Sequence, residues 1–172
     1  IGFVTRQSVE LEFSPTIISL ILAGKVGSRI ASELGTMRVT EQIDALEIMG
    51  INPATFLILP KIIASMIINP FLIMMSMLLA VIGGWFAGIS TGLFPSAEYI
   101  YGIQSFFHMY DIFYAITKTV VFAFIIASVS AYHGFYTKGG ALEVGEASTN
   151  GVVYSSIAII FMNLILTQIL LA

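Results

Sequence analysis

Two long stretches without a charged side chain constrain this sequence more than any other feature. No Asp, Glu, Lys or Arg occurs from Ile62 to Ala97, and none occurs from Ala147 to Ala172. As an α-helix, the part from Ile62 to Ile89 is about 42 Å long. A bilayer has a hydrocarbon core of roughly 30 Å, so this helix must tilt, bend or extend beyond it. Pro70 lacks a backbone donor, so we expect a kink there.

The composition indicates a membrane protein. Of the 172 residues, 58% are hydrophobic and 10% are charged, whereas a soluble domain is about one quarter charged. The net charge of −3 argues against a nucleic-acid partner. The sequence contains no cysteine, which excludes disulfides and thiolate metal sites. It starts at Ile1 without a methionine or a signal-peptide pattern, so we expect an N-terminal part to be missing.

We predict one all-α integral membrane domain over residues 1–172, with an outer interfacial segment at residues 90–111. Its four transmembrane helices are expected at about residues 9–31, 60–89, 112–133 and 150–172. Ten of the 21 aromatic residues lie between positions 85 and 114, and aromatic rings favour the headgroup level. Helix packing explains a part of these aromatics equally well.

The distribution of Lys and Arg predicts the orientation of the spans. The loop between the first two spans has Lys25, Arg29, Arg38 and Lys61, whereas the next loop, from Ser90 to Asp111, has neither residue type. The third loop contains Lys138. Cytoplasmic loops carry the excess of positive charge, so we expect the first and third loops in the cytoplasm and the second outside.

The first cytoplasmic loop contains a predicted short amphipathic helix over residues 37–50. One face is apolar, and an acidic stripe of Glu41, Asp44 and Glu47 lies beside it. Gly50 is expected to end the helix, because Asn52-Pro53 follows and prevents continuation. One interpretation is a solvated helix lying on the membrane. Such helices are usually rich in Lys and Arg, so the acidic stripe favours docking to a cytoplasmic protein.

Two segments in and beside this loop resemble the MlaE/YrbE permease family. They are AGKVGS at residues 23–28 and ELGTMRVTEQIDALE at residues 33–47. Further similarities occur at Pro60, Gly83-Gly84, residues 118–122 and residues 139–141, so that the resemblance covers essentially the whole chain. The long second motif carries most of its specificity.

The resemblance implies a membrane subunit of an ABC lipid transporter that works with an MCE-domain protein. In that family the second motif is a coupling helix, which docks to a cytoplasmic ATPase. The family has an N-terminal interfacial helix and five spans, of which this chain looks as though it lacks that helix and the first span. The residues that the resemblance assigns to ATPase coupling are Glu33, Arg38, Glu41, Gln42, Asp44 and Glu47.

The resemblance also places candidate lipid-cavity residues near the start of the chain. They are Arg6, Glu10, Glu12, Phe13 and Pro15. Glu12 and Pro15 match the family pattern at this place. The pattern has an arginine where this sequence has Leu11, so a charge pair with Glu12 requires another cation, such as Arg6. Arg6 and Glu10 are also expected to pair, because they lie one turn apart. The alternative for Glu12 is that its carboxylate extends to the outer interface.

Lys118 is the one charge in the third predicted span. It has either a functional role, as intramembrane charges often do, or a structural one. In the structural interpretation it extends to the outer interface or reaches Asp111.

The sequence predicts no catalytic and no metal-binding residues. Residues 140–145 have two glycines at the spacing of a phosphate loop, but Glu146-Ala147 follows where Lys and Ser or Thr are required. His108 and His133 lie on opposite sides of the membrane in the predicted topology. We therefore expect no enzyme and no cofactor in this chain, with ATP and Mg²⁺ held by the partner ATPase.

The expected function is a multi-pass permease subunit in the cytoplasmic (inner) membrane that moves phospholipid-like lipids to or from an MCE-protein shuttle or tunnel. The expected partners are the ATPase, a second copy of the chain, the MCE-domain protein and membrane lipid. Two alternatives stay open. One is an ABC permease for another amphiphile or a small solute, and the other is a scaffold subunit that transports nothing.

Overall fold

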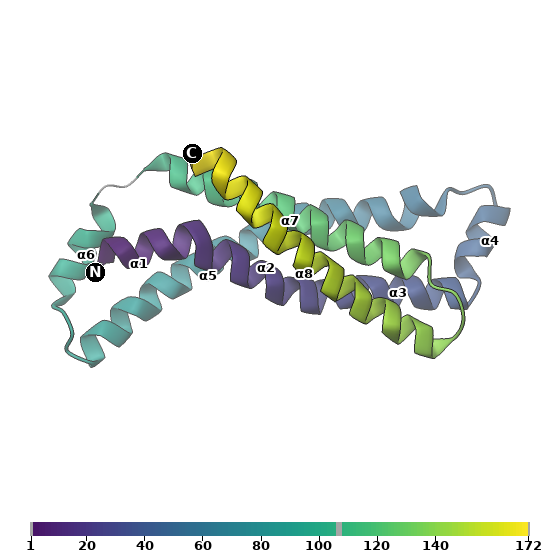
Figure 1. Ribbon diagram of the computed structural model, residues 1–172, viewed down its shortest axis with the longest axis horizontal. Helices are drawn as coiled ribbons and strands as arrows, with labels where there is room; N and C mark the ends of the chain where they lie inside the picture. Colours follow the sequence, from purple (N-terminus) through teal and green to yellow (C-terminus); the bar gives the residue numbers. More distant parts are fainter. Residues whose placement is uncertain (1, 106–107, 172) are drawn as a thin grey trace.

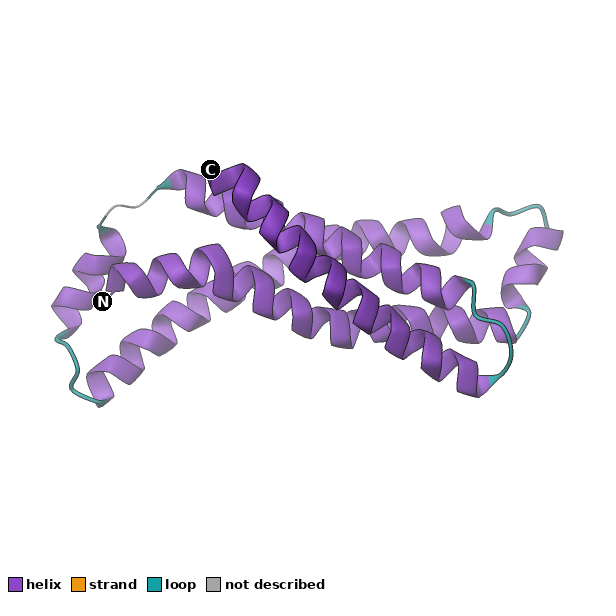
Figure 2. Cartoon of the chain, in the orientation of Figure 1, coloured by secondary structure: helices purple, strands orange, loops and turns teal. Residues whose placement is uncertain are grey.

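The computed structural model describes residues 2–105 and 108–171, and the described chain is a bundle of helices (Figures 1 and 2). Ile1, Phe106, Phe107 and Ala172, which belong to the predicted domain and its segments, lie outside the described residues. The N-terminus and α6 lie at one end of the bundle (Figure 1). The short helix α4 and the α7–α8 connection lie at the other end.

The first helix runs along the whole length of the bundle as alternating α and π turns. It comprises α1 (Gly2–Ser8), η1 (Val9–Ile17), α2 (Ile18–Leu22), η2 (Ala23–Gly27) and α3 (Ser28–Val39). Pro15 lies inside the first π segment. Because a proline cannot donate to the preceding turn, the wider π turns are a local adjustment that keeps the helix continuous.

Three helices are long and apolar enough to cross a membrane: Ala54–Ser90, Met109–Phe135 and Ala141–Leu170. The first joins η3 (Ala54–Ile58) to α5 (Leu59–Ser90), and the others are α7 (Met109–Phe135) and α8 (Ala141–Leu171). These three correspond to the last three predicted spans. The first helix is not among them, so the first predicted span, at about residues 9–31, remains a prediction. The α5 helix continues through Pro70 without a break.

Small residues allow α3, α7 and α8 to approach one another closely. Ala23, Gly27, Ala31 and Gly35 recur every fourth residue, and all four are buried. A Cβ at Gly134 of α7 would lie 2.5 Å from the Ala31 carbonyl oxygen. Close backbone approach of this kind is a common way for helices to pack in a membrane, where apolar side chains gain little from leaving lipid.

The outer segment contains α6 (Ser96–Gln104), which folds back against α1 and α5. Tyr99 is buried, and its hydroxyl donates to the Val81 carbonyl oxygen at 3.1 Å. Its ring stacks on Phe94 at a centroid distance of 5.1 Å. Some of the aromatics predicted at this level therefore pack helices, as the second interpretation expected.

The single helix predicted over residues 37–50 is wrong. The helix α3 continues to Val39, and α4 covers only Gln42–Ile48. Glu41 between them has φ 60°, a left-handed conformation that turns the chain and separates the two helices.

The predicted end of this helix is confirmed. Gly50 adopts φ 78°, and its N–H donates to the Glu47 carbonyl oxygen, while the Ile51 N–H donates to that of Leu46. These two bonds form a Schellman motif. The Asn52 side chain then accepts the Ala54 N–H at 3.0 Å and starts the next helix.

Candidate functional site

Three pairs of polar residues meet inside the bundle, one pair from each of three helices. The pairs are Glu12 and Thr16 in the first helix, Tyr114 and Lys118 in α7, and Asn163 and Thr167 in α8. Each pair is spaced by four residues, so both members lie on one face of their helix. Because the surrounding helices are largely apolar, the six side chains form one polar junction.

Lys118 lies at the centre of this polar junction. Its side chain is completely buried, and its Nζ lies 2.9 Å from Oε1 of Glu12. The same ammonium donates to the Tyr114 hydroxyl at 2.7 Å and to the Thr167 hydroxyl at 3.1 Å. It also donates to the Leu11 carbonyl oxygen at 3.3 Å. These acceptors satisfy the three N–H donors of the ammonium, whose burial without partners would be strongly unfavourable.

The Glu12 carboxylate is shared among the three helices. One oxygen accepts from Lys118 and from the Thr167 hydroxyl, the latter at 3.1 Å, and the other accepts from the Asn163 amide at 3.2 Å. The side-chain oxygen Oδ1 of Asn163 accepts from the Thr16 hydroxyl, also at 3.2 Å. The polar junction therefore links residues that are far apart in the sequence.

Glu12 also reaches the surface. Its side chain is 42% exposed, and it lines a hollow of about 230 Å³ together with Phe13, Thr16 and Ile17. Phe13 is exposed beside it, whereas Pro15 is buried. The open side thus combines a carboxylate with apolar side chains, which suits a molecule that has both a polar and an apolar part.

Arg6 lies away from this hollow. It is buried, its Nε is 3.6 Å from Glu10, and its guanidinium donates to the carbonyl oxygens of Ile103 and Ser105 at the end of α6. The predicted pairing of Arg6 with Glu10 is therefore present. Cations favour the C-terminal ends of helices, so Arg6 attaches α6 to the first helix.

The structure changes the interpretation of the intramembrane charges. Lys118 is buried in the bundle, so the alternative in which it extends to the outer interface or reaches Asp111 is wrong. The cation that pairs with Glu12 is Lys118, not Arg6. The sequence did not indicate the pair of Lys118 with Glu12, because 106 residues separate the two. The signal that could have indicated the contact is the four-residue spacing of polar pairs in three apolar helices, a pattern that also includes Tyr114, Asn163 and Thr167.

The residues predicted to couple to an ATPase lie at the α4 end of the bundle. Arg38 donates to Asp44 at 2.8 Å and lies 3.9 Å from Glu47, so it partly neutralises two members of the acidic stripe. Glu33 pairs instead with Lys61 at 2.9 Å. Glu41 and Gln42 are exposed.

Apolar side chains dominate the tip of α4. Ile48 is 88% exposed and Met49 is 64% exposed, whereas Ile43 on the opposite face is completely buried. The exposed surface of this loop thus has an apolar tip at the C-terminal end of α4, whereas Glu41 lies at the N-terminal end of that helix. The acidic stripe is only a part of this surface.

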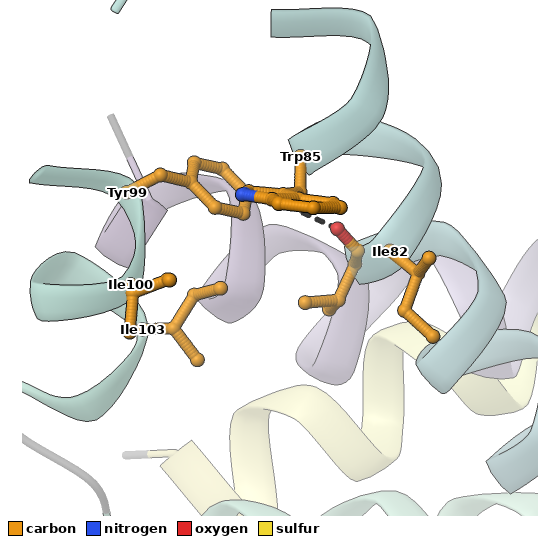
Figure 3. A pocket seen from close by; sticks show the side chains of 6 residues that line it. Ile82, Trp85, Tyr99, Ile100 and Ile103 are labelled. Carbon is orange, nitrogen blue, oxygen red and sulfur yellow. Dashed lines mark hydrogen bonds between the residues drawn. The ribbon is translucent and has the colours of Figure 1, made fainter. Parts of the chain in front are cut away.

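A further hollow lies at the α6 end of the bundle (Figure 3). It has a volume of about 280 Å³, and it is lined by Val81, Ile82, Trp85, Tyr99, Ile100 and Ile103. Burial raises the pKa of Tyr99, which keeps its hydroxyl protonated as the donor to Val81. The hydroxyl is thereby engaged, so apolar surface remains to line the hollow.

Within residues 2–105 and 108–171, no group of three or more His, Asp or Glu side chains could hold a metal ion.

Comparison with known proteins identifies relatives along nearly the whole chain. The family model described as "Permease MlaE" matches residues 1–169. A probable ABC transporter permease protein of Rickettsia typhi is 38% identical over 170 residues, covering 99% of this chain and 66% of the relative. A protein of the same description from Synechocystis is 36% identical, covering 99% of this chain and 65% of the relative.

One plant relative is the Arabidopsis thaliana Protein TRIGALACTOSYLDIACYLGLYCEROL 1, chloroplastic. It is 37% identical over 177 residues, with coverage of 98% of this chain and 48% of the relative. The chain thus spans slightly less than two thirds of the length of the bacterial relatives and about half of the plant one. The family match extends over almost every residue, and the chain belongs to the MlaE permease family.

Proposed function

We propose that this chain is the membrane subunit of an ABC transporter that moves phospholipid-like lipids. The observation that carries this proposal is the half-exposed Glu12 carboxylate beside the exposed Phe13 and Ile17. A lipid presents the same combination of a polar headgroup and apolar tails. The name of the plant relative contains that of a galactolipid, which favours a lipid over a small solute.

In this proposal two copies of the chain face each other across the hollows at Glu12 and enclose a shared cavity. An MCE-domain protein outside the membrane exchanges lipid with that cavity. Long apolar side chains remain exposed on α5 and α8, among them Phe71, Phe86 and Phe161. A single copy therefore leaves a large apolar surface for lipid or for its partner.

The ATPase is proposed to bind the tip of α4. The exposed Ile48 and Met49 at the C-terminal end of α4 are suited to an apolar groove, and the exposed Glu41 at its N-terminal end suits a basic rim of that groove. Because the Schellman motif at Gly50 and the Arg38–Asp44 ion pair hold α4 in place, movement of the ATPase would be transmitted to α3 and α5.

Reconstitution tests the proposal. The protein is placed in liposomes with its ATPase and a phospholipid that carries a fluorescent acyl chain. We expect ATP-dependent transfer of that lipid to an acceptor protein, and loss of transfer in the Ile48→Asp/Met49→Asp variant. Leu142→Asp, which changes an 83% exposed apolar residue at the start of α8, is the matched control and should retain transfer.

The alternatives predict different results. If the chain is a permease for another solute, the ATPase would hydrolyse ATP without movement of the lipid. A scaffold subunit would bind the ATPase and show no transport of any amphiphile. Either result would contradict the proposed function.

A further inference from the structure

The first helix presents one exposed face that changes from apolar to basic along its length. Phe13, Ile17, Ile21, Lys25 and Arg29 are all exposed and recur every four residues. In a pure α-helix a four-residue repeat drifts around the axis. The π turns at Val9–Ile17 and Ala23–Gly27 are wider and reduce this drift, so the five side chains form a stripe along the helix.

Lys25 and Arg29 differ from most other cations of the described chain because no carboxylate lies within 4 Å of them. Arg6, Arg38, Lys61 and Lys118 all form ion pairs. Lys138, in the α7–α8 connection, is exposed and likewise has no ion-pair partner among the described residues. Two cations one turn apart on one exposed face are therefore available for an external anion.

Two contacts place Arg29 at the boundary of the apolar layer. The Ser148 hydroxyl of α8 donates to the Ser28 carbonyl oxygen at 3.1 Å, a few residues before the apolar part of α8 begins at Val152. On the other side, Lys61 directly precedes the uncharged tract of α5 and pairs with Glu33. The level of Arg29 is thus that of lipid headgroups. Lys25 lies about 6 Å deeper and can reach the same level with its long side chain.

Arg29 also lines a hollow of about 360 Å³ with Ser32, Glu33, Thr36 and Met37. The Glu33 carboxylate would repel an anion, but Lys61 neutralises it at 2.9 Å. The charge that remains on this edge is positive.

We propose that Lys25 and Arg29 bind the phosphate of an anionic phospholipid in the cytoplasmic leaflet, with its acyl chain lying along Ile21, Ile17 and Phe13. The apolar part of the stripe leads directly to the hollow at Glu12, so the lipid would enter or leave the cavity along this helix. Its role in transport rests on the proposed function, whereas the binding itself does not require ATP.

Native mass spectrometry of the purified full-length protein, without the ATPase, tests this inference. The protein is incubated with equal amounts of phosphatidylglycerol and phosphatidylcholine that carry the same acyl chains. We expect the wild type to retain phosphatidylglycerol in preference to phosphatidylcholine. In Lys25→Gln/Arg29→Gln the ratio of the two retained lipids should fall by about fivefold for each of the two cations removed. Lys25→Arg/Arg29→Lys preserves both charges and should retain the preference. Lys138→Gln is the control for a cytoplasmic charge outside the stripe and should also retain it.

Several results would overturn the inference. Equal retention of both lipids by the wild type is one such result, and an equal loss of the preference in Lys138→Gln is another. Displacement by inorganic phosphate with equal retention of both lipids would indicate a free-anion site. If Lys25→Gln/Arg29→Gln retains phosphatidylglycerol but no longer co-purifies with the ATPase, the two cations bind an acidic protein surface. Failure of lipid transport with an intact preference contradicts only the proposed function.

Discussion

The Nζ of Lys118 and the Glu12 carboxylate lie 2.9 Å apart, although 106 residues separate them in the sequence. This ion pair connects the first helix to α7, and hydrogen bonds from Asn163 and Thr167 extend it to α8. Lys118 is the buried member of this ion pair, whereas Glu12 faces the hollow. A ligand that approaches Glu12 therefore meets a carboxylate whose charge is already partly balanced.

Removing the ammonium should destabilise the bundle. In Lys118→Gln, the Glu12 carboxylate loses its cation, and we expect the free energy of unfolding to fall by about 2 kcal/mol. Thermal unfolding in detergent measures this change. Lys61→Gln breaks a partly exposed pair and should cost less than about 1 kcal/mol. In a double-mutant cycle with Glu12→Gln, additive losses would mean that the two side chains are not coupled.

Arg6 should hold α6 against the first helix. Arg6→Gln removes the cation from the end of α6, so we expect amide hydrogen exchange across Ser96–Gln104 to become about tenfold faster. Glu10→Gln preserves the bonds from Arg6 to the carbonyl oxygens and should change exchange much less. Equally faster exchange in both variants would show that the Arg6–Glu10 ion pair, and not the bonds to the end of α6, holds α6 in place.

The close contact of α3 and α7 should not tolerate a larger residue at Gly134. Since an added Cβ would lie 2.5 Å from the Ala31 carbonyl oxygen, Gly134→Ala should destabilise the protein by about 1–3 kcal/mol. Gly145→Ala is the matched control, because nothing lies within 4 Å of a Cβ there. Alanine has the higher helix propensity, so this control should stabilise α8 slightly. The melting temperatures of the two variants should move in opposite directions.

The left-handed conformation of Glu41 makes the α3–α4 turn sensitive to residue type. Glu41→Gly should raise the free energy of unfolding by about 1 kcal/mol, because glycine adopts φ 60° without strain. Glu41→Val should lower it, since a β-branched residue is disfavoured there. Chemical denaturation of the two variants provides the comparison. If both variants unfold like the wild type, the turn carries no strain.

Glu41→Lys separates the two parts of the proposed docking surface. Reversing this exposed charge should weaken ATPase binding without abolishing it, because Ile48 and Met49 remain available. Co-purification at low and high salt measures the effect, and the difference from the wild type should shrink as salt rises. A complete loss at both salt concentrations would mean that the acidic side chain dominates docking.

The sequence by itself determined the membrane class, three of the spans and the end of α4. Uncharged tracts as long as those of α5 and α8 have few stable structures other than membrane-spanning helices. Gly50 followed by Asn52-Pro53 ends a helix through local backbone preferences. The resemblance carried by residues 23–28 and 33–47 was likewise a property of the sequence, and the family match over residues 1–169 confirms it.

Apart from the local Arg6–Glu10 pair, only the tertiary structure decided which charges meet. The partner of Lys118 depends on how three helices pack, and periodicity within one helix contains no information on that. The same holds for the carbonyl acceptors of Arg6, which lie at the end of α6, and for Arg38, which pairs with Asp44 and Glu47 across the turn at Glu41. The sequence did not predict that turn, because the left-handed backbone conformation is locally unfavourable for a glutamate. It persists only where the surrounding helices hold it.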